Sequence, residues 1–162
     1  LLGLSCYCGS FHCSKLHIKQ IYNKLFIHLL KLLNLWKQVV QNFVFVIEQN
    51  ISESEEWDAQ DSISLHFVVY AQDQPIATAR LLQNNSIGRV AVLQQARGTG
   101  LGKRLMQHII QVAKDQQREY VKLSAQTHAI GFYVNLGFSQ HGDEYLDCGI
   151  PHVDMTMNLK QD

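Results

Sequence analysis

The chain has 162 residues, of which 46% are hydrophobic and 17% are charged. This length supports one domain with a substantial core and is short for two. Fourteen Lys and Arg residues balance fourteen Asp and Glu residues, so the formal net charge is zero. Because nucleic-acid-binding proteins usually gather a basic excess on one face, this balance argues against a nucleic acid as the primary partner.

Residues 1–20 are interpreted as an N-terminal extension of unknown purpose, and residues 21–162 as a single domain. Three of the four cysteines lie in the extension, at spacings that match neither a disulfide framework nor a closed zinc site. We therefore expect reduced thiols, no bound metal and a cytoplasmic location. The four cysteines are Cys6, Cys8, Cys13 and Cys148.

The first expected helix covers about residues 25–43. Apolar side chains recur there at alternating steps of four and three, which is typical of an amphipathic helix that packs on a core. Polar residues such as Lys31 and Gln38 interrupt the run, so it predicts no membrane span. The acidic, serine-rich stretch 50–62 follows and is expected to be an exposed connection.

The periodicity then changes to two. Alternating side chains predict strands over 65–70, 76–82 and 86–93, separated by short polar turns. Consecutive strands with such short connections form an antiparallel meander.

A second helical pattern covers 101–116, followed by a strand over 120–125 and a short helix over 127–136 that ends at Gly137. The tail alternates again and predicts a strand with one solvent-exposed face, formed by His152, Asp154, Thr156 and Asn158. The order of elements predicts a mixed α/β (α+β) domain. Its central sheet is expected to be mostly antiparallel, with flanking helices.

A glycine-rich loop, Arg97-Gly98-Thr99-Gly100-Leu101-Gly102, joins the third strand of the meander to the long helix. A helix N-terminus offers unpaired N–H groups and the positive end of the helix dipole, and glycines let the backbone approach an anion. The loop is therefore expected to hold a phosphate.

The spacing of the loop argues against two kinds of nucleotide site. A dinucleotide site requires G-x-G-x-x-G in a parallel βαβ unit, whereas the loop has G-x-G-x-G after antiparallel strands. A P-loop requires Ser or Thr after Gly-Lys, whereas Arg104 follows Gly102-Lys103. A glycine-rich turn without a ligand is the remaining structural alternative.

The run from Val90 to Gly102 resembles the acetyl-CoA signature of the GNAT superfamily of N-acetyltransferases, which ends in Gln/Arg-x-x-Gly-x-Gly/Ala. Arg97, Gly100 and Gly102 match its fixed positions. The block 123–138 resembles the next strand and helix of the family, with its Phe-Tyr-x-x-x-Gly-Phe ending. Residues 45–50 and 149–155 are similar to the ElaA-like subgroup, and the likeness as a whole covers about 32–159.

The resemblance implies the acyl-CoA N-acyltransferase fold, in which two neighbouring strands splay into a V that admits acetyl-CoA. It also implies that the backbone of Ala91 and Val92 binds the pantetheine arm and the thioester carbonyl, although both residues are equally suited to a strand core. Gln126 stands where many relatives carry an Asn that contacts the CoA arm. The expected pyrophosphate ligands are the amides of Arg97, Gly98, Thr99, Gly100, Leu101, Gly102 and Lys103.

Acyl transfer to an amine requires a base for the ammonium, whose ordinary pKa is ~10.4, and an acid for the departing thiolate. Tyr133 is the candidate acid, because the family tyrosine at this place points at the CoA sulfur. Its alternative role is an aromatic core residue. Glu48, Glu144 and His152 are the candidate bases, and each is otherwise a solvated charge or a strand-edge side chain.

Two functions from different classes remain open on these residues. The first is an N-acetyltransferase that acts on a small-molecule or protein amine. The second is a non-catalytic acyl-CoA-binding module that senses or scaffolds. Neither a nucleic acid nor a membrane is expected as a partner, and a homodimer is left open.

Overall fold

The computed structural model describes residues 17–21, 40, 44, 63–72 and 74–160. The helix expected over 25–43, the connection over 50–62 and Glu48 lie outside the described residues, apart from Val40. In the described part, strands β1 to β4 form one sheet in the order β1-β2-β3-β4, and three more form a second sheet in the order β5-β7-β6. The first sheet consists of β1 (His17–Ile21), β2 (Leu65–Ala71), β3 (Gln74–Leu81) and β4 (Ile87–Val92).

The predicted meander is confirmed, since β2, β3 and β4 pair antiparallel in chain order. The sequence pattern reveals no strand within 1–20, yet β1 pairs antiparallel with β2 and begins the sheet at His17. The second sheet consists of β5 (Tyr120–Gln126), β6 (Ser139–Asp147) and β7 (Ile150–Asn158). Its middle strand is β7, which pairs antiparallel with both neighbours.

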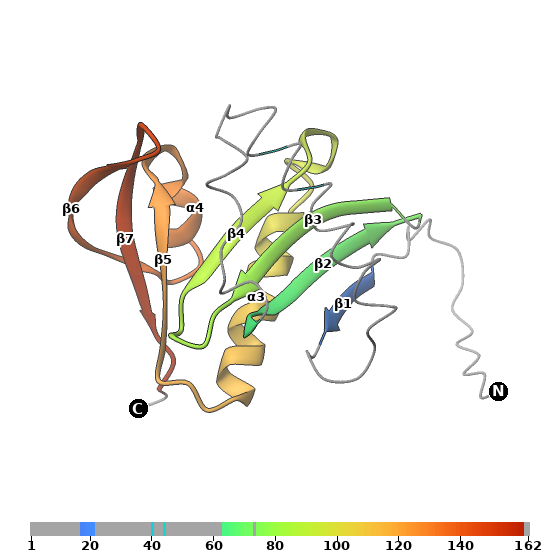
Figure 1. Cartoon of the computed structure of the whole chain (residues 1–162), viewed down its shortest axis with the longest axis horizontal. Helices are drawn as coiled ribbons and strands as arrows, with labels where there is room; N and C mark the ends of the chain where they lie inside the picture. The colour runs from blue at the N-terminus through green and yellow to red at the C-terminus, as the bar shows by residue number, and fades with distance from the viewer. Residues whose placement is uncertain (1–16, 22–39, 41–43, 45–62, 73, 161–162) are drawn as a thin grey trace.

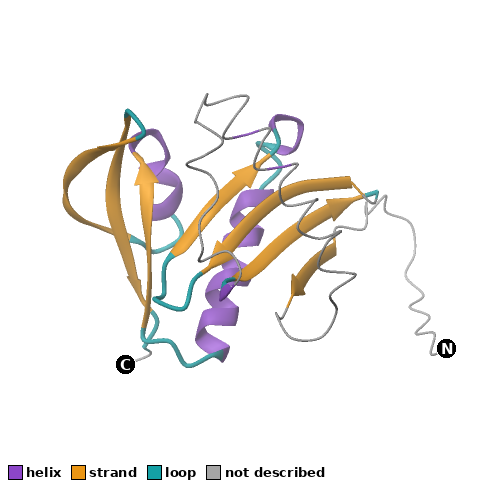
Figure 2. Ribbon diagram, viewed as in Figure 1, coloured by secondary structure: helices purple, strands orange, loops and turns teal. Residues whose placement is uncertain are grey.

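Two helices lie on one side of the strands, behind them in the view of Figures 1 and 2. They are α3 (Leu101–Asp115) and α4 (Ile130–Val134), which follows the short 3₁₀ turn η4 (Thr127–Ala129). The buried face of α3 is the one that the sequence pattern predicts, from Leu101 to Ala113. Within the described residues, neither helix is long and apolar enough to cross a membrane.

Apolar burial between α3 and the sheet forms the main core. Phe67 on β2, Leu105 and Ile109 on α3 and Met155 on β7 are fully buried there. Each such side chain stabilises the fold by about 1.5–3 kcal/mol when it leaves water. The core therefore fixes α3 against both sheets and, with it, the position of the glycine-rich loop.

The predicted V-shaped splay is present between β4 and β5. The two strands meet at a parallel bridge between Ser86 and Lys122, where the Lys122 N–H donates to the Asn85 carbonyl at 3.0 Å. Beyond this point they diverge towards their C-terminal ends (Figure 1). The loop that follows β4 and the turn that follows β5 both lie at the open end of the V.

Candidate active site

The glycine-rich loop follows β4 through the 3₁₀ turn η3 (Gln94–Ala96) and leads directly into α3. Gly98 has φ = 75° and Gly100, the N-cap of α3, has φ = 76°. Residues with a Cβ rarely adopt this left-handed conformation. A Cβ at either position would meet nothing within 4 Å, so the backbone conformation rather than limited space requires glycine here.

Among the described residues, none accepts from the backbone N–H groups in the first turn of α3. The first hydrogen bond of the helix runs from the Arg104 N–H to the Gly100 carbonyl at 3.1 Å, and no described side chain caps the preceding amides. The first turn carries no acidic residue, and the exposed Lys103 lies within it. The Thr99 hydroxyl donates to the Ala96 carbonyl at 2.8 Å, which ties the loop together. This arrangement fits a diphosphate, because N–H donors and the positive helix end point the same way.

The start of α3 packs close to two other elements at Gly102. A Cβ at this position would lie 3.5 Å from the Phe132 Cζ on α4 and 3.7 Å from the Val92 Cγ2 on β4, which are ordinary van der Waals distances. The start of α3 therefore lies next to β4 and to α4, the helix that follows β5.

A β-bulge shapes the inner edge of β4. Thr78 pairs with Ala91 and Arg80 with Gly88, so β4 has one more residue than β3 over this stretch. The extra residue is accommodated where Arg89 adopts φ = 53°. Bulges of this kind bend a strand and increase its twist, which turns β4 away from β5.

Strand alternation decides which backbone groups face the gap. The Leu93 N–H donates to the Ile76 carbonyl at 2.9 Å, so the polar groups of Leu93 and Ala91 point towards β3. Those of Val92 point the other way, towards the open edge. The Val92 carbonyl accepts a hydrogen bond from the Arg97 Nε at 2.9 Å.

Tyr133 is held at the C-terminal end of α4 by its capping motif. The Gly137 N–H donates to the Val134 carbonyl at 2.9 Å, and the Phe138 N–H donates to the Tyr133 carbonyl at 3.1 Å. With Gly137 at φ = 98°, this is a Schellman motif, which confirms the predicted helix stop. The apolar contact that accompanies the motif is the Tyr133–Phe138 ring pair, at 5.9 Å between centroids.

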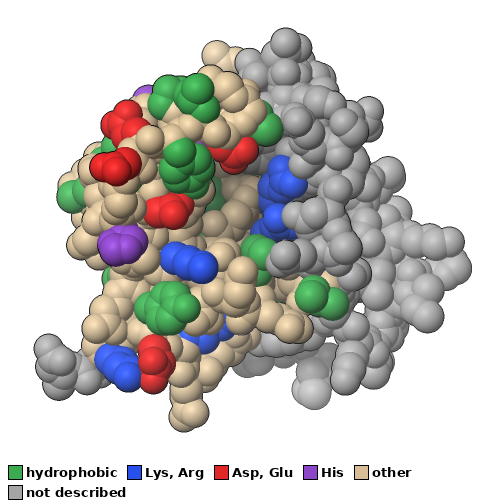
Figure 3. All heavy atoms as spheres, turned by 60° about the vertical axis from the view of Figure 1, so that its left-hand side comes forward, with side chains coloured by type: hydrophobic (Ala, Val, Ile, Leu, Met, Phe, Trp, Pro, Cys, Tyr) green, Lys and Arg blue, Asp and Glu red, His purple; other side chains and the backbone are tan. Residues whose placement is uncertain are grey.

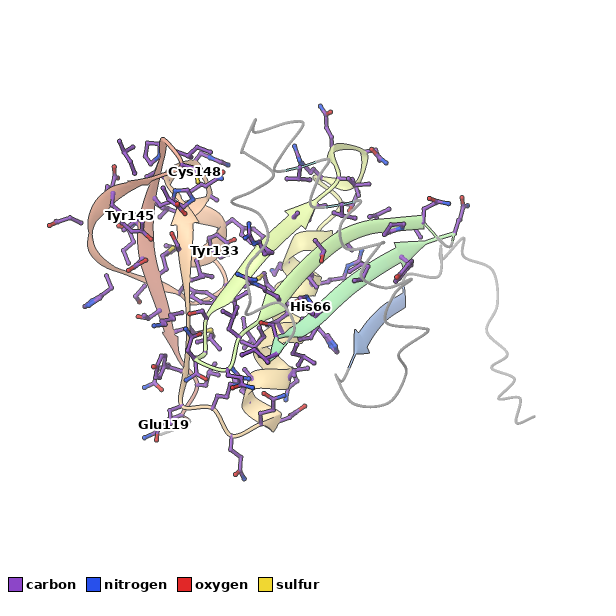
Figure 4. All side chains as sticks on the ribbon, viewed as in Figure 1. His66, Glu119, Tyr133, Tyr145 and Cys148 are labelled. Atoms are coloured by element: carbon purple, nitrogen blue, oxygen red, sulfur yellow. The ribbon has the colours of Figure 1, made fainter. Side chains whose placement is uncertain are left out.

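The environment of Tyr133 keeps its phenol protonated. The side chain is 9% exposed, and burial raises the pKa of Tyr133 to about 12. Figure 4 shows it beside β5, in the region where β4 and β5 diverge. At neutral pH the hydroxyl is therefore a proton donor.

His152 is buried on β7, which corrects the expectation that it lies on a wet face. It is 8% exposed, and the Tyr145 ring stacks on it with 6.2 Å between centroids. Its Nδ1 lies 2.8 Å from the Ile150 carbonyl. Because a carbonyl only accepts, Nδ1 carries the proton and Nε2 keeps its lone pair in the neutral ring. His152 also pairs across the strands with Gln126, at the end of β5.

A hydrogen-bonded group that the sequence did not reveal lies next to His152. Tyr145 on β6 donates its hydroxyl proton to Asp154 Oδ1 at 2.9 Å, and its oxygen lies 2.5 Å from the Ser124 Oγ. The tail alternation placed Asp154 and His152 on one face, but no pattern in the sequence pairs β5, β7 and β6. Glu144, the third candidate base, is exposed on β6.

The chain matches the family model of the acetyltransferase (GNAT) domain over residues 34–159. That match covers well over half of the sequence. The chain belongs to the GNAT acetyltransferase family. This GNAT protein is an acyltransferase, and proteins of its fold use acetyl-CoA.

Relatives place this GNAT protein in the ElaA-like subgroup. ElaA of Escherichia coli is 31% identical over 126 residues, covering 73% of this chain and 82% of ElaA. The crystal structure of E. coli ElaA has a TM-score of 0.77 and 26% identity, covering 88% of this chain and 99% of that one. The YyaT protein of Bacillus subtilis is 34% identical over 128 residues, covering 75% of this chain and 86% of YyaT. The crystal structure of an acyl-CoA N-acyltransferase from Pseudomonas aeruginosa has a TM-score of 0.77 and 31% identity, covering 88% of this chain and 99% of that one.

Proposed function

We propose that this protein transfers the acetyl group of acetyl-CoA to a primary amine by direct attack in a ternary complex. The observation that carries the proposal is the position of Val92 on the edge of β4 that faces away from β3. No strand in the described part of the chain pairs with this edge at Val92, which lies at the open end of the V beside the first-turn amides of α3, and its carbonyl accepts only from Arg97 Nε. Acetyl-CoA would supply an activated acetyl group as a thioester.

The binding residues follow from the backbone. The amides from Gly98 to Lys103 would hold the pyrophosphate, with Gly98 and Gly100 providing the loop conformation. The Arg97 N–H, which the sequence also suggested, already donates to the Gln94 carbonyl at 3.1 Å. Val92 would pair with the pantetheine arm through the groups that face away from β3. Ala91 would then contribute indirectly, because its own backbone groups are directed at β3. Gln126, at the end of β5, would contact the same arm from the opposite wall.

Two side chains on the β5 side of the gap would handle protons. His152 Nε2 would accept the proton that the incoming ammonium must lose before its nitrogen attacks. Tyr133 would hold a proton for the departing sulfur, since its raised pKa keeps the phenol neutral. The N–C bond forms and the C–S bond breaks, and one proton is released overall.

The proposal is tested by incubating the protein with acetyl-CoA and a panel of primary amines and measuring the free CoA thiol. Sequential initial-rate kinetics, without an acetylated protein by mass spectrometry, are the expected result. Acetyl-CoA binding without turnover of any amine would instead indicate a non-catalytic acyl-CoA module. Failure of acetyl-CoA to bind would refute the site itself.

A further inference from the structure

A row of polar side chains crosses the three-stranded sheet on the face opposite α3 and α4. Along β5 the buried residues Val121, Leu123 and Ala125 face the core. Ser124 alternates with them and therefore faces the other way. Ser124 pairs in register with Asp154 on β7, so both side chains are on this outer face.

The hydrogen bonds of the row have one direction. A carboxylate only accepts, so the Tyr145 hydroxyl donates to Asp154, and the Ser124 hydroxyl must then donate to Tyr145. Burial, together with the carboxylate of Asp154, raises the pKa of Tyr145 and keeps this donor protonated. The row ends on Asp154, whose Oδ2 has neither a hydrogen bond nor an ion pair within the described part of the chain.

Lys122 on β5 is the one Lys or Arg on these three strands. It alternates with Val121 and Leu123 and so shares the outer face with Ser124, but no ion pair joins it to Asp154 in the described part of the chain. The sequence contains no Lys or Arg between Lys122 and Lys160, although the chain as a whole is neutral. Figure 3 turns the β6–β7 side forward and shows acidic side chains gathered in its upper part. The exposed carboxylates on these two strands belong to Asp143, Glu144, Asp147 and Asp154.

A second observation comes from the buried histidine. His152 lies two residues before Asp154 on β7, so both project to the same face, with roughly 7 Å between their Cα atoms. The stacked Tyr145 ring confirms that the imidazole belongs to this face. A buried proton acceptor and a carboxylate that has no ion pair in the described part of the chain thus lie side by side, at a spacing that a chain of about four methylenes spans.

We infer that Asp154 selects a dicationic acceptor, by binding a second ammonium while the reacting amine lies at His152. This inference rests on the proposed function. The Ser124–Tyr145–Asp154 row fixes the carboxylate, so that one oxygen faces the substrate. A diamine, or a lysine-like amine beside a second positive charge, is the acceptor class that this arrangement fits.

Three probes of one length test the inference: 1,4-diaminobutane, n-butylamine and 4-aminobutanoate. All three carry a primary amine, and their far ends are positive, neutral and negative. We expect 1,4-diaminobutane to bind most tightly in isothermal titration calorimetry, by about ten-fold over n-butylamine. The preference should decline as salt is raised, because Asp154 is exposed.

Asp154→Asn removes the charge and keeps an oxygen that accepts from Tyr145. It should reduce the affinity for 1,4-diaminobutane about ten-fold and leave that for n-butylamine unchanged. Asp115→Asn is the matched control. Asp115 is also exposed, but it accepts from Gln111 at the far end of α3. A loss of affinity for 1,4-diaminobutane that is larger in Asp154→Asn than in Asp115→Asn supports the inference. Equal losses in the two variants, or equal binding of the three probes by the native protein, overturn it.

The binding measurement separates this inference from the proposed function. If 1,4-diaminobutane binds through Asp154 but no amine is acetylated, the selectivity stands and the transferase proposal falls. If all three amines are acetylated with the same kcat/KM in the native and Asp154→Asn proteins, the transferase stands and the selectivity falls.

Discussion

Ser86 and Lys122 form the isolated parallel bridge at which β4 and β5 meet in the described part of the chain. On one side of this bridge the β3–β4 turn is tied to the start of β5, and on the other side the two strands separate into the V. The backbone hydrogen bond from Lys122 to Asn85 and the side chain of Arg118 both act at this apex. The width of the gap at the reacting end therefore depends on contacts at the closed end.

Arg118→Met should destabilise the protein through the apex. The Arg118 Nη1 donates to the Leu82 carbonyl at 2.5 Å and to Asn85 Oδ1 at 3.2 Å, so it joins the β3–β4 turn to the start of β5. Losing these bonds should lower the free energy of unfolding by about 1–3 kcal/mol in urea. Lys114→Met, at an exposed position in the last turn of α3, is the control and should change the free energy of unfolding little. Equal effects would show that the apex contact is not important.

Gly100→Ala should weaken CoA binding. The substitution forces a Cβ into φ = 76°, at a cost of about 1–2 kcal/mol, although the space around it is open. If the loop relaxes to avoid that strain, its amides leave the diphosphate, and the dissociation constant should rise on the order of ten-fold. Calorimetry with CoA measures this change. Gly131→Ala, without a positive φ and with nothing within 4 Å, should bind CoA normally.

Tyr133→Phe should separate catalysis from binding. The Phe ring keeps the contacts with Phe132 and Phe138 and loses only the hydroxyl. We expect kcat to decrease about 10²-fold or more, with the dissociation constant of acetyl-CoA unchanged. Tyr120→Phe, at an exposed position on β5, is the control. An unaltered kcat would leave Tyr133 with a packing role alone.

The same hydroxyl predicts a loss of stability in alkali. Its folded pKa of about 12 lies above the ordinary value of 10.0, because burial disfavours the phenolate. This contribution is fully present below pH 10.0 and is lost as the pH rises through about 12, by up to about 3 kcal/mol. Over this range the native protein should therefore lose unfolding free energy relative to Tyr133→Phe. A constant difference would mean that the phenol titrates without a penalty.

His152→Gln should slow acetylation. The substitution removes the Nε2 proton acceptor but retains a polar side chain next to Gln126 and Tyr145. We expect kcat/KM to decrease about 10²-fold or more, with the dissociation constant of acetyl-CoA unchanged. The His141→Gln variant, changed at an exposed position of β6, should keep the native rate. Equal rates in both variants would exclude His152 as the base.

Most elements from β2 to β7 could be predicted because local periodicity reports burial; β6 is exposed along its whole length and carries no such pattern. The stripe from Leu101 to Ala113 and the Gly137 stop are properties of neighbouring residues, and the structure confirms both. By contrast, β1 was missed. Its five residues, His17–Ile21, carry no alternation strong enough to separate them from the stretch around them, and only the pairing with β2 defines the strand.

The residues of the candidate site likewise differ in whether the sequence alone reveals them. The glycine-rich loop and Tyr133 are found from the sequence because their chemistry is contained in short segments. The row of Ser124, Tyr145 and Asp154 is not, because its members come from three strands whose spatial order, β5-β7-β6, differs from their chain order.

The sequence by itself determined most elements of this protein from β2 onwards, the glycine-rich start of α3 and the GNAT family. Tertiary structure alone decided that Val92 rather than Ala91 faces the gap, and that His152 is buried. Both outcomes depend on register between strands. A shift of one residue would reverse every such assignment, and only long-range pairing and the β4 bulge fix it.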